Sequence, residues 1–256
     1  MGWFHEGHLS LLRHARAGCD VVVVSLFVNP AQFGPGEDLD AYPRDERRDA
    51  QLAAAEGVDY LFAPPLEEVY PPGFDTTVSV GGLTEVLCGH PSRRGPAHFT
   101  GVTTVVTKLL GMVQPDVAYV GQKDAQQALV IGKLIQDLNI PVRLEVCPTV
   151  REPDGLALSS RNAYLSPAER ERALGLSRAL KAAEERAALG ERDAAGLLDA
   201  ARAELEAAGV EPEYLELRSA EDLSPVQRLN GSALLAVAGR VGRARLIDNV
   251  ILGGDS

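Results

Sequence analysis

The hydrophobic and polar positions in the first half of the chain alternate between strand-like and helix-like segments. The run from 20 to 29 is largely apolar and β-branched, which predicts a strand buried on both faces. The other predicted elements are strands at 59–63, 116–121 and 141–150 and helices at 8–18, 44–57, 100–113 and 124–138. Strands that alternate with helices of about ten to fifteen residues predict an α/β fold, in which helices cover both faces of a parallel sheet.

The second half has a different order of elements. Ser166 and Glu169 form a predicted capping box, with Pro167 at the first helical position. We expect helices from there to about Gly190 and at 193–209, followed by strands at 213–218, 232–238 and 243–250. Helices followed by strands predict a small α+β domain. The chain is therefore expected to contain two domains, at 1–149 and 150–256.

Composition and charge exclude several classes of protein. The net charge of −11 argues against non-specific nucleic-acid binding, because the average surface repels a phosphate backbone. The apolar stretch Val21–Val28 is too short to span a bilayer, and no signal segment opens the sequence, so we expect no membrane partner and a cytoplasmic protein. Cys19, Cys88 and Cys147 are widely spaced and are interpreted as free thiols in a reducing compartment.

The first group of residues suited to chemistry is the segment Met1-GWFHEGH. His5 and His8 flank Gly7 where a helix is predicted to begin. A helix N-terminus offers unpaired N–H groups and partial positive charge to a phosphate, and imidazoles can donate to oxygens that gain charge in a transition state. Two simpler interpretations are open: an exposed polar helix start, or two zinc ligands one turn apart.

A second group, Gly121-QKDAQQ, follows a predicted strand. Lys123 can balance phosphate charge, Asp124 can accept hydrogen bonds from ribose hydroxyls, and Gln126 and Gln127 can bind a small polar acid. Ligands bind at the carboxyl ends of the strands in such sheets, which favours this assignment. An ordinary solvated helix start is the alternative.

Two further groups are weaker. Ser159-SRN offers hydroxyls and a guanidinium for triphosphate oxygens, or is a polar turn before the next helix. Asn29-PAQF contains Gln32, which can bind a carboxylate or hydroxyl; Asp38 and Asp40 follow it and are more simply solvated loop charges than magnesium ligands. The chain has neither a P-loop sequence nor a Gly-x-Ser-x-Gly elbow.

In combination these segments resemble the pantothenate synthetase (pantoate–β-alanine ligase) family of the H-x-G-H nucleotidyltransferase superfamily, along nearly the whole chain. The residues that carry the resemblance are Met1-GWFHEGH, Phe27-VNPAQF, Asp40-AYPRD, His98-FTGV, Gly121-QKDAQQ, Pro148-TVRE, Leu156-ALSSRNAYLS and Tyr214-LELR. The resemblance implies a Rossmann-like domain that binds ATP and pantoate, a small C-terminal lid domain and a homodimer. It also implies an ATP-dependent ligase that condenses pantoate with β-alanine through a pantoyl-adenylate, producing pantothenate, a coenzyme A precursor, and releasing AMP and pyrophosphate.

The resemblance also implies roles for individual residues. His8, His5 and Lys123 are the expected catalytic residues, and Gln32 and Gln127 the expected pantoate-binding residues. The expected ATP-binding residues are Met1, Gly2, Trp3, Phe4, His5, Glu6, Gly7, His8, Gly121, Gln122, Lys123, Asp124, Val150, Leu158, Ser159, Ser160 and Arg161. Mg²⁺ is expected to accompany ATP, with no protein ligands assigned.

Three features depart from the family pattern. Gln122 replaces a usual glutamate, and the spacing before His98 is one residue longer, so no arginine is assigned there. The chain also begins inside the H-x-G-H turn, without the family's first strand, so we expect Met1 to be an internal methionine. Two alternative functions stay open: another H-x-G-H nucleotidyltransferase, or a degenerate nucleotide-binding protein.

Overall fold

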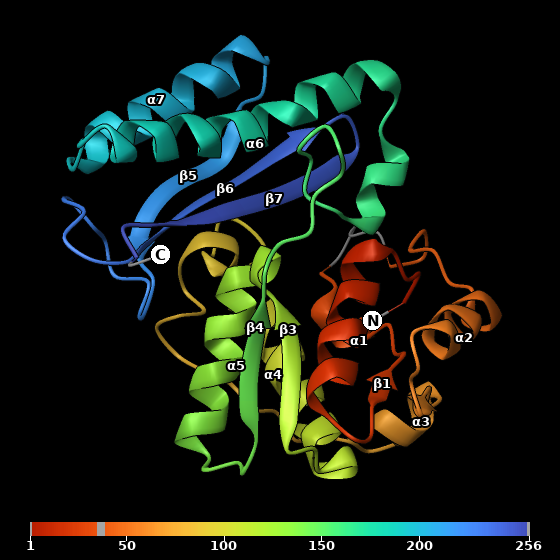
Figure 1. Cartoon of the computed structure of the whole chain (residues 1–256). Coiled ribbons are helices and arrows are strands. Elements are labelled where there is room, and N and C mark those ends of the chain that lie inside the picture. The colour runs from red at the N-terminus through yellow and green to blue at the C-terminus, as the bar shows by residue number, and fades with distance from the viewer. Residues whose placement is uncertain (1, 35–38, 255–256) are drawn as a thin grey trace. The chain divides into compact units, whose positions relative to one another are not determined.

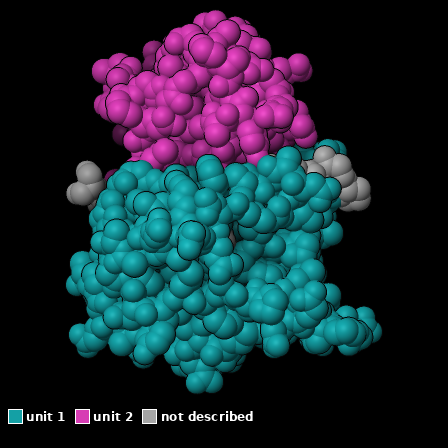
Figure 2. Space-filling view, turned by 90° about the vertical axis from the view of Figure 1, so that its right-hand side faces the viewer, with its two compact units in different colours: residues 1–122, 126–148 teal, residues 123–125, 149–256 magenta. Residues whose placement is uncertain are grey.

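The computed structural model describes residues 2–34 and 39–254, which divide into two compact units. Unit 1 comprises 1–122 and 126–148, and unit 2 comprises 123–125 and 149–256. Figure 2 colours each unit separately. The short segment 123–125 therefore belongs to the unit built mainly from the C-terminal half, although it follows a strand of unit 1.

Unit 1 contains the alternating strands and helices that the sequence predicts (Figure 1). Its described elements are α1 (Glu6–Gly18), β1 (Val23–Ser25), η1 (Pro30–Gln32), α2 (Glu46–Ala55), β2 (Tyr60–Phe62), α3 (Leu66–Val69), η2 (Leu87–Gly89), α4 (Pro96–Val113), β3 (Val117–Gly121), α5 (Ala125–Asp137) and β4 (Arg143–Cys147). A 3-10 turn, η3 (Gln122–Asp124), links β3 to α5. Helix α4 begins four residues before its predicted start, with Pro96 in its first turn.

The strands of unit 1 form two parallel pairs. β1 pairs with β2, with Val24 opposite Leu61, and β3 pairs with β4, with Tyr119 opposite Glu145. Apolar side chains bury each pair against helices: Leu12 of α1 and Ala53 of α2 pack with β1, and α4 and α5 pack with β3 and β4. The α/β class with parallel strands is thus confirmed.

The prediction that the run 20–29 is buried on both faces was wrong. Val22 and Val24 are 3% and 2% exposed, whereas Val21 and Val23 are 59% and 39% exposed. Successive side chains of a strand point to opposite faces, and only one face of this strand is covered by the core of unit 1. The valine run therefore reflects β propensity more than two-sided burial.

Unit 2 contains a helical layer on an antiparallel sheet. The capping box is present: Ser166 Oγ accepts from the Glu169 N–H, and the Glu169 carboxylate accepts from the Ser166 N–H at 2.8 Å. Its elements are η4 (Ser160–Tyr164), α6 (Pro167–Ala188), α7 (Ala194–Ala207), β5 (Pro212–Ser219), β6 (Ala233–Val241) and β7 (Ala244–Leu252). The strand order is β5-β6-β7, and α6 and α7 lie along the sheet (Figure 1).

Small residues allow the two helices of unit 2 to pack closely on this sheet. Ala173, Ala179 and Ala183 of α6 are fully buried, and Leu197 and Leu205 of α7 fill the layer above the strands. At about 25 cal/mol per Å² of apolar surface removed from water, such a layer is the main favourable term for this unit. Within the described residues, no helix is long and apolar enough to cross a membrane.

Candidate functional site

The two histidines of the H-x-G-H segment lie together at the start of α1. His5 is the N-cap residue, and the rings of His5 and His8 stack with their centroids 4.0 Å apart. The phenyl ring of Phe4, which is fully buried, lies 5.6 Å from the His8 ring. The predicted pairing of the two imidazoles at a helix N-terminus is therefore present in the structure.

One hydrogen bond determines the tautomer of His8. The His5 backbone N–H donates to His8 Nδ1 at 3.4 Å. Because Nδ1 accepts this bond, a neutral His8 carries its proton on Nε2. That nitrogen is then a donor, as required of a group that stabilises developing negative charge on phosphate oxygens.

Helix α2 fixes the backbone that leads into this turn. The Phe4 N–H donates to Asp49 Oδ1 at 2.7 Å, and Arg48 donates to the Phe4 carbonyl at 2.9 Å. Asp49 is fully buried and pairs with Arg48 at 3.0 Å, while the Arg48 guanidinium lies 4.6 Å from the Trp3 ring centroid. Trp3 has a φ of 53°, an uncommon value for this residue type. Asp49 and Arg48, which the sequence did not single out, thus hold both backbone groups of Phe4.

Glu6, predicted to bind ATP, has a side chain engaged elsewhere. Its carboxylate pairs with Arg13 further along α1, and Arg13 also pairs with Glu56 at 2.8 Å. The hydrogen bond from Arg13 lowers the pKa of Glu6. The backbone N–H of Glu6 lies in the first turn of the helix, where N–H groups have no intrahelical acceptor.

The Asn29-Pro-Ala-Gln turn presents Gln32 from a closely packed position. Asn29 is 3% exposed, and its side chain accepts from Tyr70 Oη at 2.8 Å and donates to the Gly101 carbonyl at 3.0 Å. It also donates to Gln32 Oε1 at 3.4 Å. A Cβ atom at Gly101 would lie 2.1 Å from the Ala31 carbonyl oxygen, so only glycine permits this approach.

Two basic side chains at the start of α4 support Gln32: His98 lies in the first turn of the helix, and Arg94 comes just before it. His98 Nδ1 lies 2.7 Å from the Gln32 carbonyl oxygen, and Arg94 lies 3.2 Å from His98 Nε2. Arg94 is always a donor, so His98 Nε2 accepts and Nδ1–H donates to Gln32. The Arg94 guanidinium also donates to the Gln32 carbonyl at 3.4 Å.

The two glutamines at the start of α5 have different environments. Gln126 is 7% exposed; its Nε2 donates to the carbonyls of Leu83 and Val86 at 2.8 and 2.7 Å, and its Oε1 accepts from the Cys88 N–H at 3.0 Å. The hypothesis that Gln126 binds a small acid was wrong, because both of its amide hydrogens hold the loop before η2. Gln127 is half-buried, and its binding of pantoate stays a prediction.

Lys123 lies in the η3 turn, and its backbone is held by strand β7. Asn249 Nδ2 donates to the Lys123 carbonyl at 2.9 Å. Gly121 ends β3, Gln122 and Lys123 are half-buried, and Asp124 is exposed. This arrangement places the predicted Gly121–Asp124 group at the carboxyl end of a parallel strand, as expected for ligand-binding residues in such sheets.

The predicted residues Val150 and Leu158 face each other across a small hairpin of unit 2. The Leu158 N–H donates to the Val150 carbonyl at 3.0 Å, Arg151 pairs with Ala157, and Gly155 turns the chain with a φ of 98°. Ser159, Ser160 and Arg161 follow directly, and Ser159 caps the η4 turn by accepting from the Arg161 N–H at 3.3 Å.

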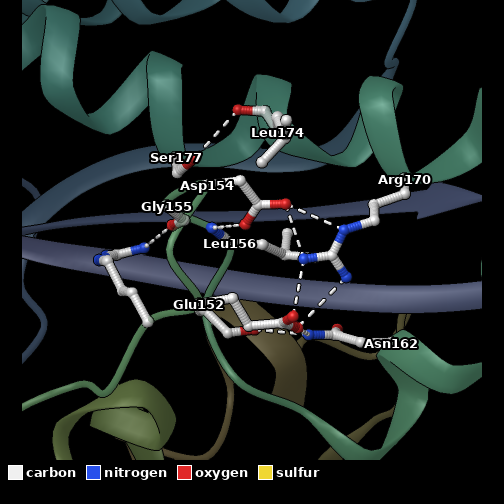
Figure 3. Close-up of polar contacts among 10 residues, drawn as sticks. Glu152, Asp154, Gly155, Leu156, Asn162, Arg170, Leu174 and Ser177 are labelled. Carbon is white, nitrogen blue, oxygen red and sulfur yellow. Dashed lines mark hydrogen bonds and ion pairs between the residues drawn. The ribbon is translucent and has the colours of Figure 1, made fainter. Parts of the chain in front are cut away.

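Arg170 of α6 fixes this hairpin by a network of charged hydrogen bonds (Figure 3). It donates to Glu152 at 2.7 Å and to Asp154 at 2.6 Å. Glu152 also accepts from Asn162 Nδ2 at 2.8 Å, so one carboxylate joins the hairpin to the residue after Arg161. Burial favours a raised pKa for Asp154, but the bonds and charge of Arg170 prevail and lower it.

The predicted residues are thus grouped within each unit. Unit 1 brings together the H-x-G-H residues at one helix end and supports Gln32 on a separate turn, while unit 2 carries Lys123, Val150 and Ser159–Arg161. Met1 and Asp38 lie outside the described residues. Among those described, no three His, Cys, Asp or Glu side chains are grouped so as to hold a metal ion.

Comparison with known proteins shows the family to which this chain belongs. The family model for pantoate-beta-alanine ligase matches residues 1–251. Pantothenate synthetase of Moorella thermoacetica is 55% identical over 253 residues, which cover 98% of this chain and 88% of the relative. That of Thermotoga neapolitana is 53% identical over 254 residues, 99% of this chain and 90% of the relative.

Solved structures extend the likeness to the fold. Pantothenate synthetase from Thermus thermophilus superposes with a TM-score of 0.94 at 50% identity, covering 98% of this chain and 90% of that one. Pantoate-beta-alanine ligase from Francisella tularensis, in complex with beta-gamma ATP and beta-alanine, has a TM-score of 0.79 at 35% identity and covers 98% and 87%. The H-x-G-H turn, the Gln32 turn and the Lys123 turn described above thus belong to a member of the pantoate–beta-alanine ligase family.

Proposed function

We propose that this chain condenses pantoate with β-alanine in an ATP-dependent reaction, through a pantoyl-adenylate. The observation that carries the proposal is the placement of His5 and His8 at the N-terminus of α1, with His8 Nε2 left as the donor, in a chain of this family. The F. tularensis relative, crystallised with a nucleotide and beta-alanine, supports the same pair of substrates here.

The first half-reaction is attack of a pantoate carboxylate oxygen on the α-phosphorus, with pyrophosphate as the leaving group. This step needs the two anionic reactants aligned and their charge balanced. The N–H groups of the first turn of α1, His8 and Lys123 are the proposed donors to the phosphates. The proposed contacts of pantoate are Gln32 and Gln127. Their amide groups are neutral, so they bind its hydroxyl and carboxylate oxygens without placing a charged group beside the carboxylate.

In the second half-reaction the β-alanine amine attacks the acyl carbon of the adenylate. An amide bond forms, the bond from carbon to the AMP oxygen breaks, and the amine gives up a proton. Water competes for the same acyl carbon, so the reaction requires a site that excludes it.

The triphosphate of the first half-reaction is proposed to have further contacts in unit 2. These are the hydroxyls of Ser159 and Ser160 and the guanidinium of Arg161.

Mg²⁺ is proposed to accompany ATP and to neutralise phosphate charge when bound. Mg²⁺ keeps several water ligands and commonly binds through substrate phosphates with one or two carboxylates. We also propose a homodimer, from the family resemblance, and residence in the cytoplasm, which suits the free thiols of Cys19, Cys88 and Cys147.

A product assay tests the proposal. Purified chain is given ATP, Mg²⁺, pantoate and β-alanine, and AMP and pantothenate are quantified, with each substrate omitted in turn. The proposal predicts equal amounts of the two products and none when pantoate or β-alanine is left out. Pyrophosphate release that needs a phosphorylated acceptor instead would assign the chain to another H-x-G-H nucleotidyltransferase, and ATP binding without turnover would indicate a degenerate nucleotide-binding protein.

A further inference from the structure

Strand β7 contains two adjacent buried polar residues that the proposed reaction does not use. Asp248 and Asn249 are 3% and 6% exposed, although the strand is otherwise built mostly from apolar residues. A buried carboxylate or amide destabilises the folded state unless it is hydrogen bonded, so the partners of these side chains show what they hold.

Asn249 holds the turn that carries Lys123. Its Nδ2 donates to the Lys123 carbonyl at 2.9 Å, and its own N–H donates to Asp248 Oδ1 at 2.8 Å. The bond fixes the backbone of Lys123, and the ammonium group of the side chain takes no part in it. The position from which the lysine side chain extends is therefore set by β7.

Asp248 holds the hairpin that precedes Ser159. Both carboxylate oxygens accept from the Arg151 guanidinium, at 2.6 and 3.0 Å, in a two-bond pair of the strong, directional kind. Arg151 also donates to the Gly155 carbonyl at 3.1 Å and pairs across the hairpin with Ala157. Through Arg151, Asp248 ties one arm of the hairpin and its turn residue Gly155 to β7.

The side chains of the adjacent residues Asp248 and Asn249 contact two different loops from opposite faces of β7. Successive residues of a strand point to opposite faces, so Asp248 reaches the hairpin from one face and Asn249 reaches the Lys123 turn from the other. The distance between their Cα atoms is fixed covalently at about 3.8 Å. A shift of either loop relative to the other strains or breaks one of these part-buried hydrogen bonds.

We propose that Asp248 and Asn249 are a positioning pair that sets the spacing between Lys123 and the Ser159–Arg161 segment for binding of a nucleotide triphosphate. The inference rests on the proposed function for the identity of the ligand, and it concerns binding of ATP and not the later chemistry. A misplacement of about 1 Å in such a site can reduce activity by about a hundredfold.

The test measures the Kd for Mg-ATP by calorimetry, with thermal unfolding of every variant, on the full chain. Asn249→Ala is expected to weaken binding about tenfold and Asp248→Asn to weaken it as well. The decisive comparison is a double-mutant cycle with Lys123→Met. If Asn249 acts through Lys123, Asn249→Ala adds little further loss in the Lys123→Met background.

Arg245→Gln is the matched control. Arg245 lies on β7 like Asp248 and Asn249, and the substitution removes its partly buried ion pair to Glu213 of β5. It is expected to lower thermal stability and leave the Kd for ATP unchanged. Should Asn249→Ala not fold, Asn249→Ser takes its place in the cycle. If neither folds, Asn249 is a purely structural residue and the proposal is overturned.

The remaining outcomes separate this proposal from the proposed function. Additive losses for Asn249→Ala and Lys123→Met, or an unchanged Kd in folded Asn249→Ala, would overturn the positioning pair alone. If the wild-type chain binds ATP but forms no pantothenate, the proposed function fails and the cycle still decides the positioning pair. A wild-type chain that binds no ATP overturns both.

Discussion

The backbone N–H of Phe4 donates to the carboxylate of Asp49 at 2.7 Å, between residues that are both fully buried. The bond connects α2 to the residue immediately before His5, so the orientation of the H-x-G-H turn depends on a side chain outside it. Arg48 completes the arrangement by donating to the Phe4 carbonyl at 2.9 Å.

Asp49→Ala is therefore expected to affect both stability and activity. It leaves a buried N–H without its acceptor and a guanidinium without its closest carboxylate, which costs about 2 kcal/mol in the free energy of unfolding. Urea denaturation measures that loss, and adenylate formation is expected to fall with it. Glu46→Ala, at an exposed position of the same helix, is the control and should change neither quantity. Equal stability of the two variants would disprove the role given to Asp49.

Gly101 permits the close approach of α4 to the turn that carries Gln32. Gly101→Ala places a methyl group 2.1 Å from the Ala31 carbonyl oxygen, so the turn must move. We expect the KM for pantoate to rise about tenfold, with a smaller effect on the KM for ATP. Gly111→Ala is a matched control in the same helix, since a Cβ there meets nothing within 4 Å; it should stabilise the protein by about 0.5–1 kcal/mol. Unchanged pantoate kinetics in Gly101→Ala would contradict the proposed role of Gln32.

Substitution of the adjacent residues Gln126 and Gln127, one at a time, should separate an effect on stability from an effect on substrate binding. Gln126→Ala removes three hydrogen bonds to the segment from Leu83 to Cys88 and is expected to lower the free energy of unfolding by about 3 kcal/mol. Gln127→Ala is expected to raise the KM for pantoate and leave stability nearly unchanged. Chemical denaturation and steady-state kinetics of both variants check this contrast, and the reverse pattern would show that the two roles have been exchanged.

The capping box of α6 predicts a pH dependence of stability. The N–H and hydroxyl of Ser166 lower the pKa of Glu169 below its ordinary value of 4.5. The unfolded chain then binds this proton more readily than the folded one. The contribution of Glu169 is consequently complete above pH 4.5 and is lost as the pH falls below that value.

Glu169→Gln should make the free energy of unfolding less dependent on pH between about 3 and 5. Denaturation at a series of pH values measures the slope. Glu171→Gln, on the same helix and bound to Arg178, serves as the control. If both variants retain the wild-type slope, the bonds from Ser166 do not lower the pKa of Glu169 as described.

Local patterns explain why most of the fold could be predicted. Helix periodicity, the Ser166 cap and the β-branched strands depend on neighbouring residues, and each predicted helix or strand has an observed counterpart within a few residues of its expected range. Helix α3 (Leu66–Val69) and the 3-10 turns were not predicted. Two-sided burial of the run 20–29 failed because burial depends on which other segments cover a strand, and periodicity in a uniform apolar run carries no such information.

The supporting residues of the site could not be predicted in the same way. Asp49 acts on a residue 45 positions away, and Asn29 on one 72 positions away, so neither partnership leaves a local pattern. A signal did exist for Asp248 and Asn249, because two polar residues interrupt a predicted strand. Polar side chains buried within a strand are almost always hydrogen bonded, but their partners lie far away in the sequence and leave no local pattern.

The most direct test of the proposed chemistry is pantoate-dependent exchange of labelled pyrophosphate into ATP, in the absence of β-alanine. We predict exchange by the wild-type chain that requires pantoate, and a loss of about a hundredfold or more in His8→Ala with its thermal midpoint unchanged. Exchange at the wild-type rate by a folded His8→Ala variant would contradict the assignment of His8 as the donor to the phosphates.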